Sequence, residues 1–586
     1  MEKLELSALL RQARNYEKAG VSEDGPKVAV LGSRSTQYFV KVFRYCLAKT
    51  GMNCPFYEGE YHGIDMDVLD QTSRLYQFAP DYVILLPFWE DVQKFPPLLA
   101  DKGDVEQHLE AVKRYFQGLW ERLGAIRHVR VLQGNFVIPP IRLLGNLEYQ
   151  EESSRNRFLQ LVNEVLFEDH PPHVTIVDLE ALSCNIGKYQ WFDYPSYFAN
   201  KAAVRLDYLP EVAQTFVRQI QAQQGHIRKC LVLDLDNTLW GGVVGDDGYE
   251  GIQLDPNNAV GEAFRSFQAY CLALRQRGVL LAVCSKNEEA TAKEPFEKNE
   301  DMILHLEDIA CFIANWKNKA ENLQSISQIL NIGVDSLVFF DDNPAERAIV
   351  KQYLPEVHVV EVPDDPALYV LQMEQEQPFD WLQITKEDLE RTASYQENGE
   401  RDRLLERFVD YGEYLQALDM KGETGNLQQQ DVGRFVQLLN KSNQFNLRTV
   451  RYTEAEVMQM MGDDTVRCLY GKLRDRFGSY GLISCVILRK NGQMCAIDSW
   501  VMSCRVLKRG VENMMFNAIL EAARDMECTS LWGEYIQTKK NQMVATFYED
   551  LGFSVLNEKV EGNGLRKEYV LYDLRRQASH CIKQRD

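Results

Sequence analysis

The sequence predicts a multidomain protein of the α/β class. With 586 residues, the chain is well beyond the size at which a single hydrophobic core stops growing, so several domains are expected. Over about the first 380 residues, short apolar runs alternate with stretches of helical periodicity, which is typical of parallel sheets covered by helices. The last part mixes strands and helices in the manner of an α+β domain. These patterns divide the chain into residues 1–225, 226–380, 381–425 and 426–586.

Composition and charge argue against several classes of protein. A formal net charge of −21 is unfavourable for a general nucleic-acid binder. The longest apolar runs have the length of strands, and the first residues lack the apolar core of a signal peptide, so we expect a cytoplasmic protein with no membrane partner. The 13 cysteines are scattered without CxxC pairs, which favours reduced thiols over a disulfide framework or a zinc site.

The first segment has the alternating pattern of a parallel sheet. After an opening helix, four runs rich in β-branched residues are expected to be strands: Lys27–Gly32, Asp81–Phe88, Val129–Val137 and His173–Leu182. Stretches of helical periodicity lie between them, for example Val105–Leu123 and Ser154–Glu168.

The later segments continue this pattern and then change it. In residues 226–380, the runs CLVLDLD, GVLLAVCSK, CFIANW, SLVFFDD and VHVVEVP predict a second parallel sheet. Residues 381–425 are charged and predict a helical connector that starts with a capping box at Thr385 and Asp388. The last segment predicts mixed elements: strands Gly481–Arg489 and Met494–Val501, and helices Gly510–Arg524 and Asn541–Asp550.

Polar side chains follow the strands of the second segment. A hydrophobic run delivers two carboxylates two residues apart, and a serine, a lysine and a pair of aspartates follow at later strand ends or helix starts. In chain order these candidate residues are Asp234, Asp236, Thr238, Ser285, Asn287, Lys319, Asp341 and Asp342. Open α/β sheets place their active sites at the carboxyl ends of the strands, so we expect these side chains to meet.

This set of residue types suits phosphoryl transfer. Asp234 can attack phosphorus while Asp236 protonates the leaving oxygen. Mg²⁺ would keep the carboxylates from repelling a phosphate, and its candidate ligands are Asp234 and Asp236 with Asp341 or Asp342. Ser285 and Lys319 can donate hydrogen bonds to the phosphoryl oxygens, and Thr238 and Asn287 are candidate substrate-binding residues. Lys317 is an alternative candidate for the role of Lys319. We prefer Lys319 because it begins the stretch KAEN.

These residues form four motifs: DxDxT (Asp234, Asp236 and Thr238), a serine (Ser285), a lysine (Lys319) and a pair of aspartates (Asp341 and Asp342). Their presence in this order resembles the haloacid dehalogenase (HAD) superfamily. Thr238 and Ser285 are 47 residues apart, and Ser285 and Lys319 are 34 apart, which leaves no room for a large cap domain. An uncapped site favours a large or carrier-tethered substrate, or a neighbouring domain that serves as the lid.

Longer stretches of the sequence resemble one particular family. KCLVLDLDNTLWGGVVGDDG, VLLAVCSKNEE, FFDDNPAER, NKSNQFNLRT and MSCRVLKRGVE resemble the FkbH-like family of polyketide pathways over residues 226–577. The resemblance implies an enzyme that takes 1,3-bisphosphoglycerate or a related phosphorylated three-carbon acid, removes its phosphates and loads a glyceryl thioester onto the phosphopantetheine of an acyl carrier protein. Two alternatives remain: a stand-alone HAD phosphatase acting on a small phosphate ester, and a non-catalytic scaffold.

A protein thiol could hold the acyl group before its transfer to the carrier. Cys284 adjoins Ser285 at the active end of its strand, and Cys504 lies in the last segment, so both are candidates. Cys230 begins its strand at the opposite edge of the sheet, which argues against it.

The C-terminal segment resembles the GNAT acyltransferase fold, whose closing helix and strand match NQMVATFYEDLGF. Lys508 occupies the place of the first glycine in the usual pyrophosphate loop, so the basic residues Arg505, Lys508 and Arg509 are candidates for binding the carrier's phosphopantetheine arm instead. Residues 465–586 carry 19 Lys and Arg against 14 Asp and Glu, although the whole chain is acidic. Because carrier proteins of this type are acidic, we interpret this end as their docking face.

The N-terminal segment resembles an SGNH-hydrolase sheet, with LGSRST after its first strand. The terminal DxxH of such enzymes is missing, since Asp193 is followed three residues later by Ser196. Ser33 and Ser35 are therefore interpreted as turn residues, and the domain as a catalytically degenerate lid or docking platform.

Overall fold

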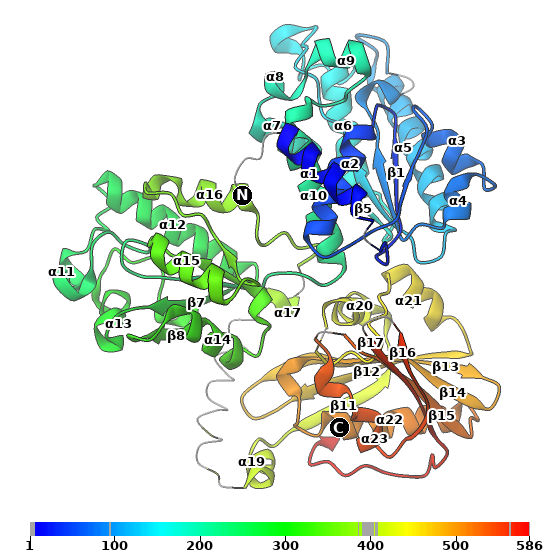
Figure 1. Ribbon diagram of the computed structural model, residues 1–586, viewed down its shortest axis with the longest axis vertical. Helices are drawn as coiled ribbons and strands as arrows, with labels where there is room; N and C mark the ends of the chain where they lie inside the picture. Colours follow the sequence, from blue (N-terminus) through cyan, green and yellow to red (C-terminus); the bar gives the residue numbers. More distant parts are fainter. Residues whose placement is uncertain are drawn as a thin grey trace. The chain divides into compact units, whose positions relative to one another are not determined.

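The computed structural model describes residues 6–20, 22–92, 95–384, 386–389, 404, 408, 410–442, 444–538, 540–561 and 564–584 (Figure 1). The chain divides into two compact units, Met1–Gln221 and Ala222–Asp586. The sequence predicted a boundary at residue 225 and further boundaries at residues 380 and 425 within the second of these units. Among the described residues, no helix combines the length and the apolar character needed to cross a bilayer.

The first unit is a five-stranded sheet of order β2-β1-β3-β4-β5, in which every neighbouring pair is parallel. Its strands are β1 (Val28–Gly32), β2 (Phe56–Glu58), β3 (Tyr82–Leu86), β4 (Arg130–Gly134) and β5 (Val174–Val177). The four expected strands are therefore present, and the fourth is shorter than expected because a helix begins at Leu179.

Helices cover both faces of this sheet, which explains why its strands are nearly continuous apolar runs. One core cluster joins one face to α1, α2, α7, α8 and α10, and a second joins the other face to α3, α4, α5 and α6. The helices of the unit are α1 (Leu6–Lys18), α2 (Gln37–Lys49), α3 (Ile64–Leu69), α4 (Arg74–Phe78), α5 (Lys102–Gly124), α6 (Arg155–Glu168), α7 (Leu179–Ile186), α8 (Lys188–Trp191), α9 (Tyr194–Asn200) and α10 (Leu209–Gln223).

Ser33 and Asp193 of this unit have structural partners. The Ser33 side chain is buried, and its hydroxyl donates to the Leu86 carbonyl at 3.3 Å. Asp193 caps α9 and accepts a 2.6 Å hydrogen bond from the Ser196 hydroxyl. Ser35 is exposed. The contacts of Ser33 agree with the turn role expected from the sequence, and the cap role of Asp193 is an addition from the structure.

The second unit begins with another parallel sheet, of order β10-β9-β6-β7-β8. One face packs on α11, α12, α13 and α16, and the other on α14 and α15. The elements are β6 (Cys230–Leu233), α11 (Val244–Gly251), α12 (Ala259–Gln276), β7 (Leu280–Ser285), α13 (Glu289–Lys298), β8 (Ile309–Ala314), α14 (Lys319–Ile329), β9 (Leu337–Phe340), α15 (Pro344–Tyr353), β10 (His358–Val359) and α16 (Tyr369–Glu376), with α17 (Lys386–Leu389) after them.

The expected absence of a large cap agrees with this part of the fold. Residues 238–319 are all described, and their helices are α11, α12, α13 and one 3₁₀ turn, which connect strands of the same sheet. The glycine-rich stretch GGVVGDDG leads into α11, which is kinked at Gly248.

The rest of the second unit is a mixed sheet of order β16-β17-β15-β14-β13-β12-β11-β18. Only its β14–β15 and β11–β18 pairs are parallel, so the expected α+β class is confirmed. The elements are α19 (Tyr411–Ala417), β11 (Lys421–Asn426), α20 (Val432–Lys441), α21 (Glu454–Met461), β12 (Val466–Arg474), β13 (Ser479–Asn491), β14 (Met494–Met502), α22 (Val511–Asp525), β15 (Ser530–Ile536), α23 (Phe547–Asp550), β16 (Ser554–Glu561), β17 (Gly564–Leu571) and β18 (Lys583–Gln584).

Two details differ from the sequence-based expectation. The connector was expected to continue to residue 425, but β11 already pairs with β12 from Lys421. The helix expected over Asn541–Asp550 is split into a 3₁₀ turn, Gln542–Val544, and the short α23. Thr385 of the expected capping box lies outside the described residues.

Candidate functional site

The carboxyl edge of the β10-β9-β6-β7-β8 sheet brings the candidate residues together. Asp234 follows the last residue of β6, Ser285 ends β7 and Asp341 follows β9. Because β9, β6 and β7 are parallel neighbours, their carboxyl ends lie at one edge, and the Asp234 amide donates to the Phe340 carbonyl at 3.0 Å. The residues at these strand ends are buried: the exposed fractions of Asp234, Ser285 and Asp341 are 7%, 2% and 0%.

Lys319 is the cation that compensates the buried carboxylates. It is the first residue of α14, whose N-cap is Asn318, and its side chain is almost completely buried. Its Nζ lies 2.9 Å from Asp234 Oδ2 and 2.5 Å from Asp341 Oδ2. Burial disfavours the charged amine, but the two carboxylates outweigh that effect and raise the pKa of Lys319 above its usual value. The competing Lys317 is exposed, so the structure favours Lys319 for this place.

Three carboxylates form a compact group that could hold a metal ion. One oxygen from each of Asp234, Asp341 and Asp342 lies within 4.8 Å of the others. Burial and the nearby charge of Asp234 raise the pKa of both Asp341 and Asp342 above the usual range. Asp234 Oδ1 is buried and has no hydrogen-bond partner. A buried carboxylate oxygen without a partner is unfavourable by itself, and a hard divalent cation would satisfy it.

The carboxylate of Asp236 lies outside this group, although the sequence suggested it as a ligand. Its Oδ1 accepts hydrogen bonds from Trp240 Nε1 at 3.0 Å and from the Val244 amide at 2.9 Å. Its Oδ2 accepts from Asn287 Nδ2 at 2.7 Å. Three donors thus fix the orientation of a partly exposed carboxylate, which suits a group that exchanges a proton with a substrate better than one that binds the ion.

Two residues that were expected to bind substrate instead contact aspartates of the site. Asn287 holds Asp236, and the fully buried Thr238 accepts a hydrogen bond from the Asp342 amide at 3.3 Å through its hydroxyl. Sequence reasoning also missed Arg347, whose guanidinium donates to the carbonyls of Asp341 and Asp342 at 2.7 Å each. The sequence could have indicated Arg347, because this arginine is the last residue of the stretch FFDDNPAER that carries Asp341 and Asp342.

Cys284 has the wrong environment for an accessible nucleophile. Its side chain is completely buried in a core cluster that includes Cys230 and Val232. Burial raises the pKa of its thiol well above the usual value, so the reactive thiolate is disfavoured. The structure therefore argues against Cys284 as the acylated residue. The side chain of the other candidate, Cys504, lies outside the described residues.

The basic residues after β14 have different surroundings. Arg505 Nε donates to the Ser503 hydroxyl at 3.3 Å, whereas Arg509 donates to the Tyr480 hydroxyl. Lys508 is exposed and has a φ of 61°, which lies in the left-handed region that favours glycine. The backbone at Lys508 thus has a conformation that glycine adopts readily, although the residue at this position is a lysine.

Replacing Lys319 by methionine should destabilise the second unit when no metal ion is present. The substitution leaves Asp234 and Asp341 buried without their cation, a loss of about 3–5 kcal/mol. The loss should shrink as the pH is lowered, because the pKa of Asp341 is raised in the folded state and protonating that carboxylate relieves its repulsion with Asp234. Urea unfolding in EDTA, with Lys317→Met as the exposed control, measures both effects. Equal stability of the two variants would contradict the assigned role of Lys319.

Comparison with known proteins covers both units. The family model described as FkbH, N-terminal domain, matches residues 27–221. The crystal structure of the N-terminal part of the protein BF1531 from Bacteroides fragilis, which contains a phosphatase domain and was complexed with Mg, is 34% identical. That match covers 65% of this chain and 100% of the solved one, with a TM-score of 0.60.

Other solved structures match a smaller part. The ribosomal-protein-S18-alanine N-acetyltransferase from Escherichia coli is 12% identical over 26% of this chain and 92% of its own, with a TM-score of 0.21. Ard1 from Thermoplasma volcanium is 14% identical over 26% of this chain and 96% of its own, also with a TM-score of 0.21. No curated protein matches the chain. The family model lies in the first unit, and the stretches that resemble FkbH-like proteins lie in the second. Together with the match that covers the whole of the solved Bacteroides fragilis chain at 34% identity, they show that the chain belongs to the FkbH-like family.

Proposed function

We propose that this protein is a Mg²⁺-dependent phosphoryl-transfer enzyme that makes a glyceryl thioester on an acyl carrier protein from 1,3-bisphosphoglycerate or a related phosphorylated three-carbon acid. The observation that carries the phosphoryl-transfer part is the group of Asp234, Asp341 and Asp342 with its buried, unpartnered Asp234 Oδ1. The Bacteroides fragilis relative was crystallised with Mg, which supports the choice of ion. The acid and the carrier follow from the family resemblance.

The geometry suggests how the residues would divide the work. Asp234 attacks the phosphorus of the C3 ester, so a bond from its carboxylate to phosphorus forms while the bond to the glyceryl oxygen breaks. Asp236 gives a proton to that oxygen and then takes one from the water that hydrolyses the aspartyl phosphate. Lys319 and Ser285 lie at the same edge and would bind phosphoryl oxygens. Mg²⁺ held by Asp234, Asp341 and Asp342 would neutralise the charge on the phosphate.

The thioester step needs less help from the protein. The acyl phosphate at C1 is already activated, so attack of the carrier's phosphopantetheine thiol on C1 forms the thioester and expels phosphate. Because Cys284 is buried in the core, we propose direct transfer to the carrier thiol rather than a relay through Cys284.

The full reaction can be tested by weighing the carrier. Incubation with Mg²⁺, 1,3-bisphosphoglycerate and holo carrier protein should add a glyceryl group to the carrier, detected by intact mass spectrometry, and should release phosphate. Asp234→Asn should abolish phosphate release from C3, because the nucleophile is lost. Phosphate release without a mass increase would support a stand-alone phosphatase instead. Full activity of Asp234→Asn would place the phosphoryl-transfer chemistry elsewhere.

Metal binding distinguishes the carboxylates. Asp341→Asn should weaken Mg²⁺ binding by about tenfold or more, since it removes a proposed ligand. Asp236→Asn should change the affinity much less, because that carboxylate is directed to Trp240, Val244 and Asn287. Isothermal titration with Mg²⁺ provides both values. An equal loss in both variants would show that the Asp236 carboxylate binds the ion as well.

Docking of an acidic carrier should depend on salt. The β12–β13 turn presents exposed Arg474 and Arg476, and Lys508 is exposed as well. Added salt screens such charges, so we expect transfer to the carrier to fall while hydrolysis of a small phosphate ester is spared. Arg474→Glu should reproduce the effect at low salt, with Lys351→Glu as a charge-matched control. Equal salt sensitivity of both reactions would contradict a charged docking face.

A further inference from the structure

An exposed tryptophan lies on a loop of the candidate active site and takes no part in the chemistry described above. All eight tryptophans lie in the part of the chain that the structure describes, and Trp316 is the only one that is exposed rather than buried or half-buried. The exposed fraction of its side chain is 73%. Leaving so large an apolar group in water is unfavourable, so its position in the fold is informative.

The loop between β8 and α14 places this indole at the carboxyl edge of the sheet. Ala314, the last residue of β8, pairs with Ser285, and the Asn315 amide donates to the Ser285 carbonyl at 3.1 Å. Trp316 comes next and precedes Lys319 by three residues, so the Cα atoms of Trp316 and Lys319 are at most about 11 Å apart. The exposed indole therefore belongs to the same loop as the lysine that neutralises the buried carboxylates.

Amide contacts fix the backbone of this loop. Asn315 Oδ1 accepts hydrogen bonds from the Lys317 amide and from Asn322 Nδ2, both at 2.9 Å. Asn315 Nδ2 donates in return to Asn322 Oδ1 at 3.3 Å. Asn318 then caps α14 by accepting from the Ala320 amide at 2.8 Å. An aromatic side chain on a fixed backbone loses little entropy when it packs against a ligand, which favours binding.

A second exposed apolar side chain is also one residue away from a contact with the site. Val243 lies in the glycine-rich stretch before α11, and its exposed fraction is 38%. The amide of the next residue, Val244, donates to Asp236 Oδ1 at 2.9 Å. The Val243 amide itself donates to Asp247 Oδ2 at 2.9 Å, which fixes this turn as well. Apolar surface is thus exposed on two separate connections of the carboxyl edge.

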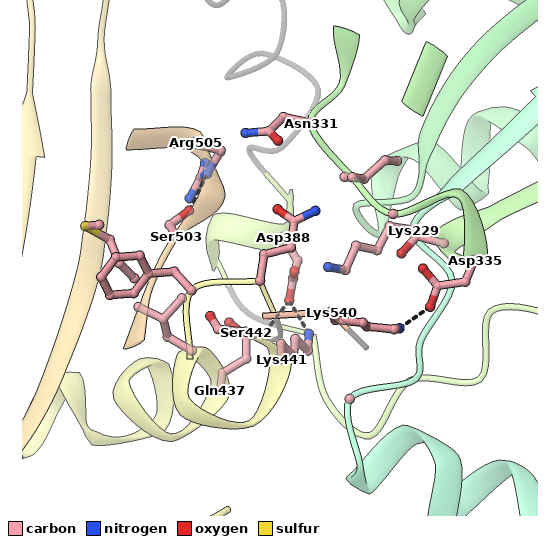
Figure 2. A pocket seen from close by; sticks show the side chains of 18 of the residues that line it. Lys229, Asn331, Asp335, Asp388, Gln437, Lys441, Ser442, Ser503, Arg505 and Lys540 are labelled. Atoms are coloured by element: carbon pink, nitrogen blue, oxygen red, sulfur yellow. Dashed lines mark hydrogen bonds and ion pairs between the residues drawn. The ribbon is translucent and has the colours of Figure 1, made fainter. Parts of the chain in front are cut away.

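The amino edge of the same sheet faces the other half of the second unit. Lys229 directly precedes β6 and lines a cavity of about 390 Å³, whereas Asp234 directly follows that strand. Figure 2 shows Lys229 and Asp335 on the parallel-sheet half, facing Ser503 of the segment after β14. A substrate therefore reaches Asp234 from the carboxyl edge, where the two exposed apolar side chains lie.

The phosphorylated three-carbon acid does not by itself account for these side chains. Its phosphate, carboxyl and hydroxyl groups are polar and gain little from contact with an indole or an isopropyl group. The phosphopantetheine arm of a carrier protein, in contrast, has methyl and amide groups along its chain, which suit the face of an aromatic ring. Residues 238–319 contain no cap domain, so a chain attached to the acid can leave the site. The arm is the component of the proposed reaction that matches the exposed surface.

We propose that Trp316 and Val243 bind the phosphopantetheine arm while the three-carbon acid lies at Asp234. This inference rests on the proposed function and adds to it the residues that recognise the arm. A phosphoglyceryl thioester then has its C3 phosphate at Asp234 and its arm against Trp316. The chemistry at phosphorus is unchanged: a bond from the Asp234 carboxylate to phosphorus forms, the bond to the C3 oxygen breaks, and that oxygen takes a proton from Asp236. Water then hydrolyses the aspartyl phosphate, and the thioester stays intact.

Matched substrates measure the contact with the arm. The full chain with Mg²⁺ would be given 3-phosphoglycerate, the 3-phosphoglyceryl thioester of pantetheine, and the same thioester on holo carrier protein. Phosphate release from each substrate provides kcat and KM. Because only the thioesters carry an arm, we expect both of them to have a higher kcat/KM than 3-phosphoglycerate, with most of the difference in KM.

Substitution of the indole separates its contact from the chemistry. Trp316→Ala should lower kcat/KM for the pantetheine thioester about tenfold relative to kcat/KM for 3-phosphoglycerate, mainly through KM, because an aromatic contact is lost. Trp316→Phe should keep much of the preference, and Val243→Ser should lose part of it. The matched control is Tyr353→Ala, which removes an exposed ring where α15 ends at the amino edge, and it should behave like the unchanged protein. Circular dichroism and thermal melting check the fold, and Trp316→Phe decides if Trp316→Ala does not fold.

Three results would overturn the proposal. The first is that folded Trp316→Ala and Tyr353→Ala prefer the pantetheine thioester to the same degree. The second is that the unchanged protein favours 3-phosphoglycerate over that thioester. The third is that Trp316→Ala affects only the carrier-bound thioester, which would place the indole against the carrier protein instead of the arm. A different result, no phosphate release by the unchanged protein from any of the substrates, would contradict the proposed function itself.

Discussion

The contact of Lys319 with Asp234 and Asp341 is the interaction on which the candidate active site depends. Three carboxylates at the end of a buried sheet would repel one another and would lose hydration without a compensating charge. Lys319 supplies that charge from the first turn of α14, and the length of its side chain lets it reach two carboxylates from neighbouring strands. Asp234 Oδ1 remains without a hydrogen-bond partner, and it is the atom at which we propose that the metal ion binds.

The supporting residues make the same edge rigid. Arg347 holds the carbonyls of Asp341 and Asp342, Thr238 holds the Asp342 amide, and Trp240 and Asn287 fix the Asp236 carboxylate. Each of these contacts orients a group of the candidate site. Catalytic groups that are fixed before the substrate arrives lose little entropy in the reaction, which is the main advantage of such a network.

The sequence alone was sufficient for the multidomain α/β class and for the order of the motifs. Apolar runs that end in Asp234, Ser285 and Asp341 are local signals, and strands that are parallel and adjacent must bring their ends to one edge. The choice of Lys319 over Lys317 also followed from the local word KAEN. The family resemblance in the second unit could be recognised for the same reason, since it rests on contiguous stretches of sequence.

Only the tertiary structure decided which side chains share a surface. Cys284 and Ser285 are neighbours in sequence, but Cys284 is enclosed by a core cluster on one face of the sheet. The separation of the Asp236 carboxylate from the metal group depends on Trp240, Val244 and Asn287, the last of which is 51 residues away. The strand β11 was hidden in a charged stretch because its partner is β12, and one cavity of the second unit is lined by residues as far apart in sequence as Gly225 and Lys540. Such contacts depend on pairing and packing between distant segments, which local periodicity and composition do not encode.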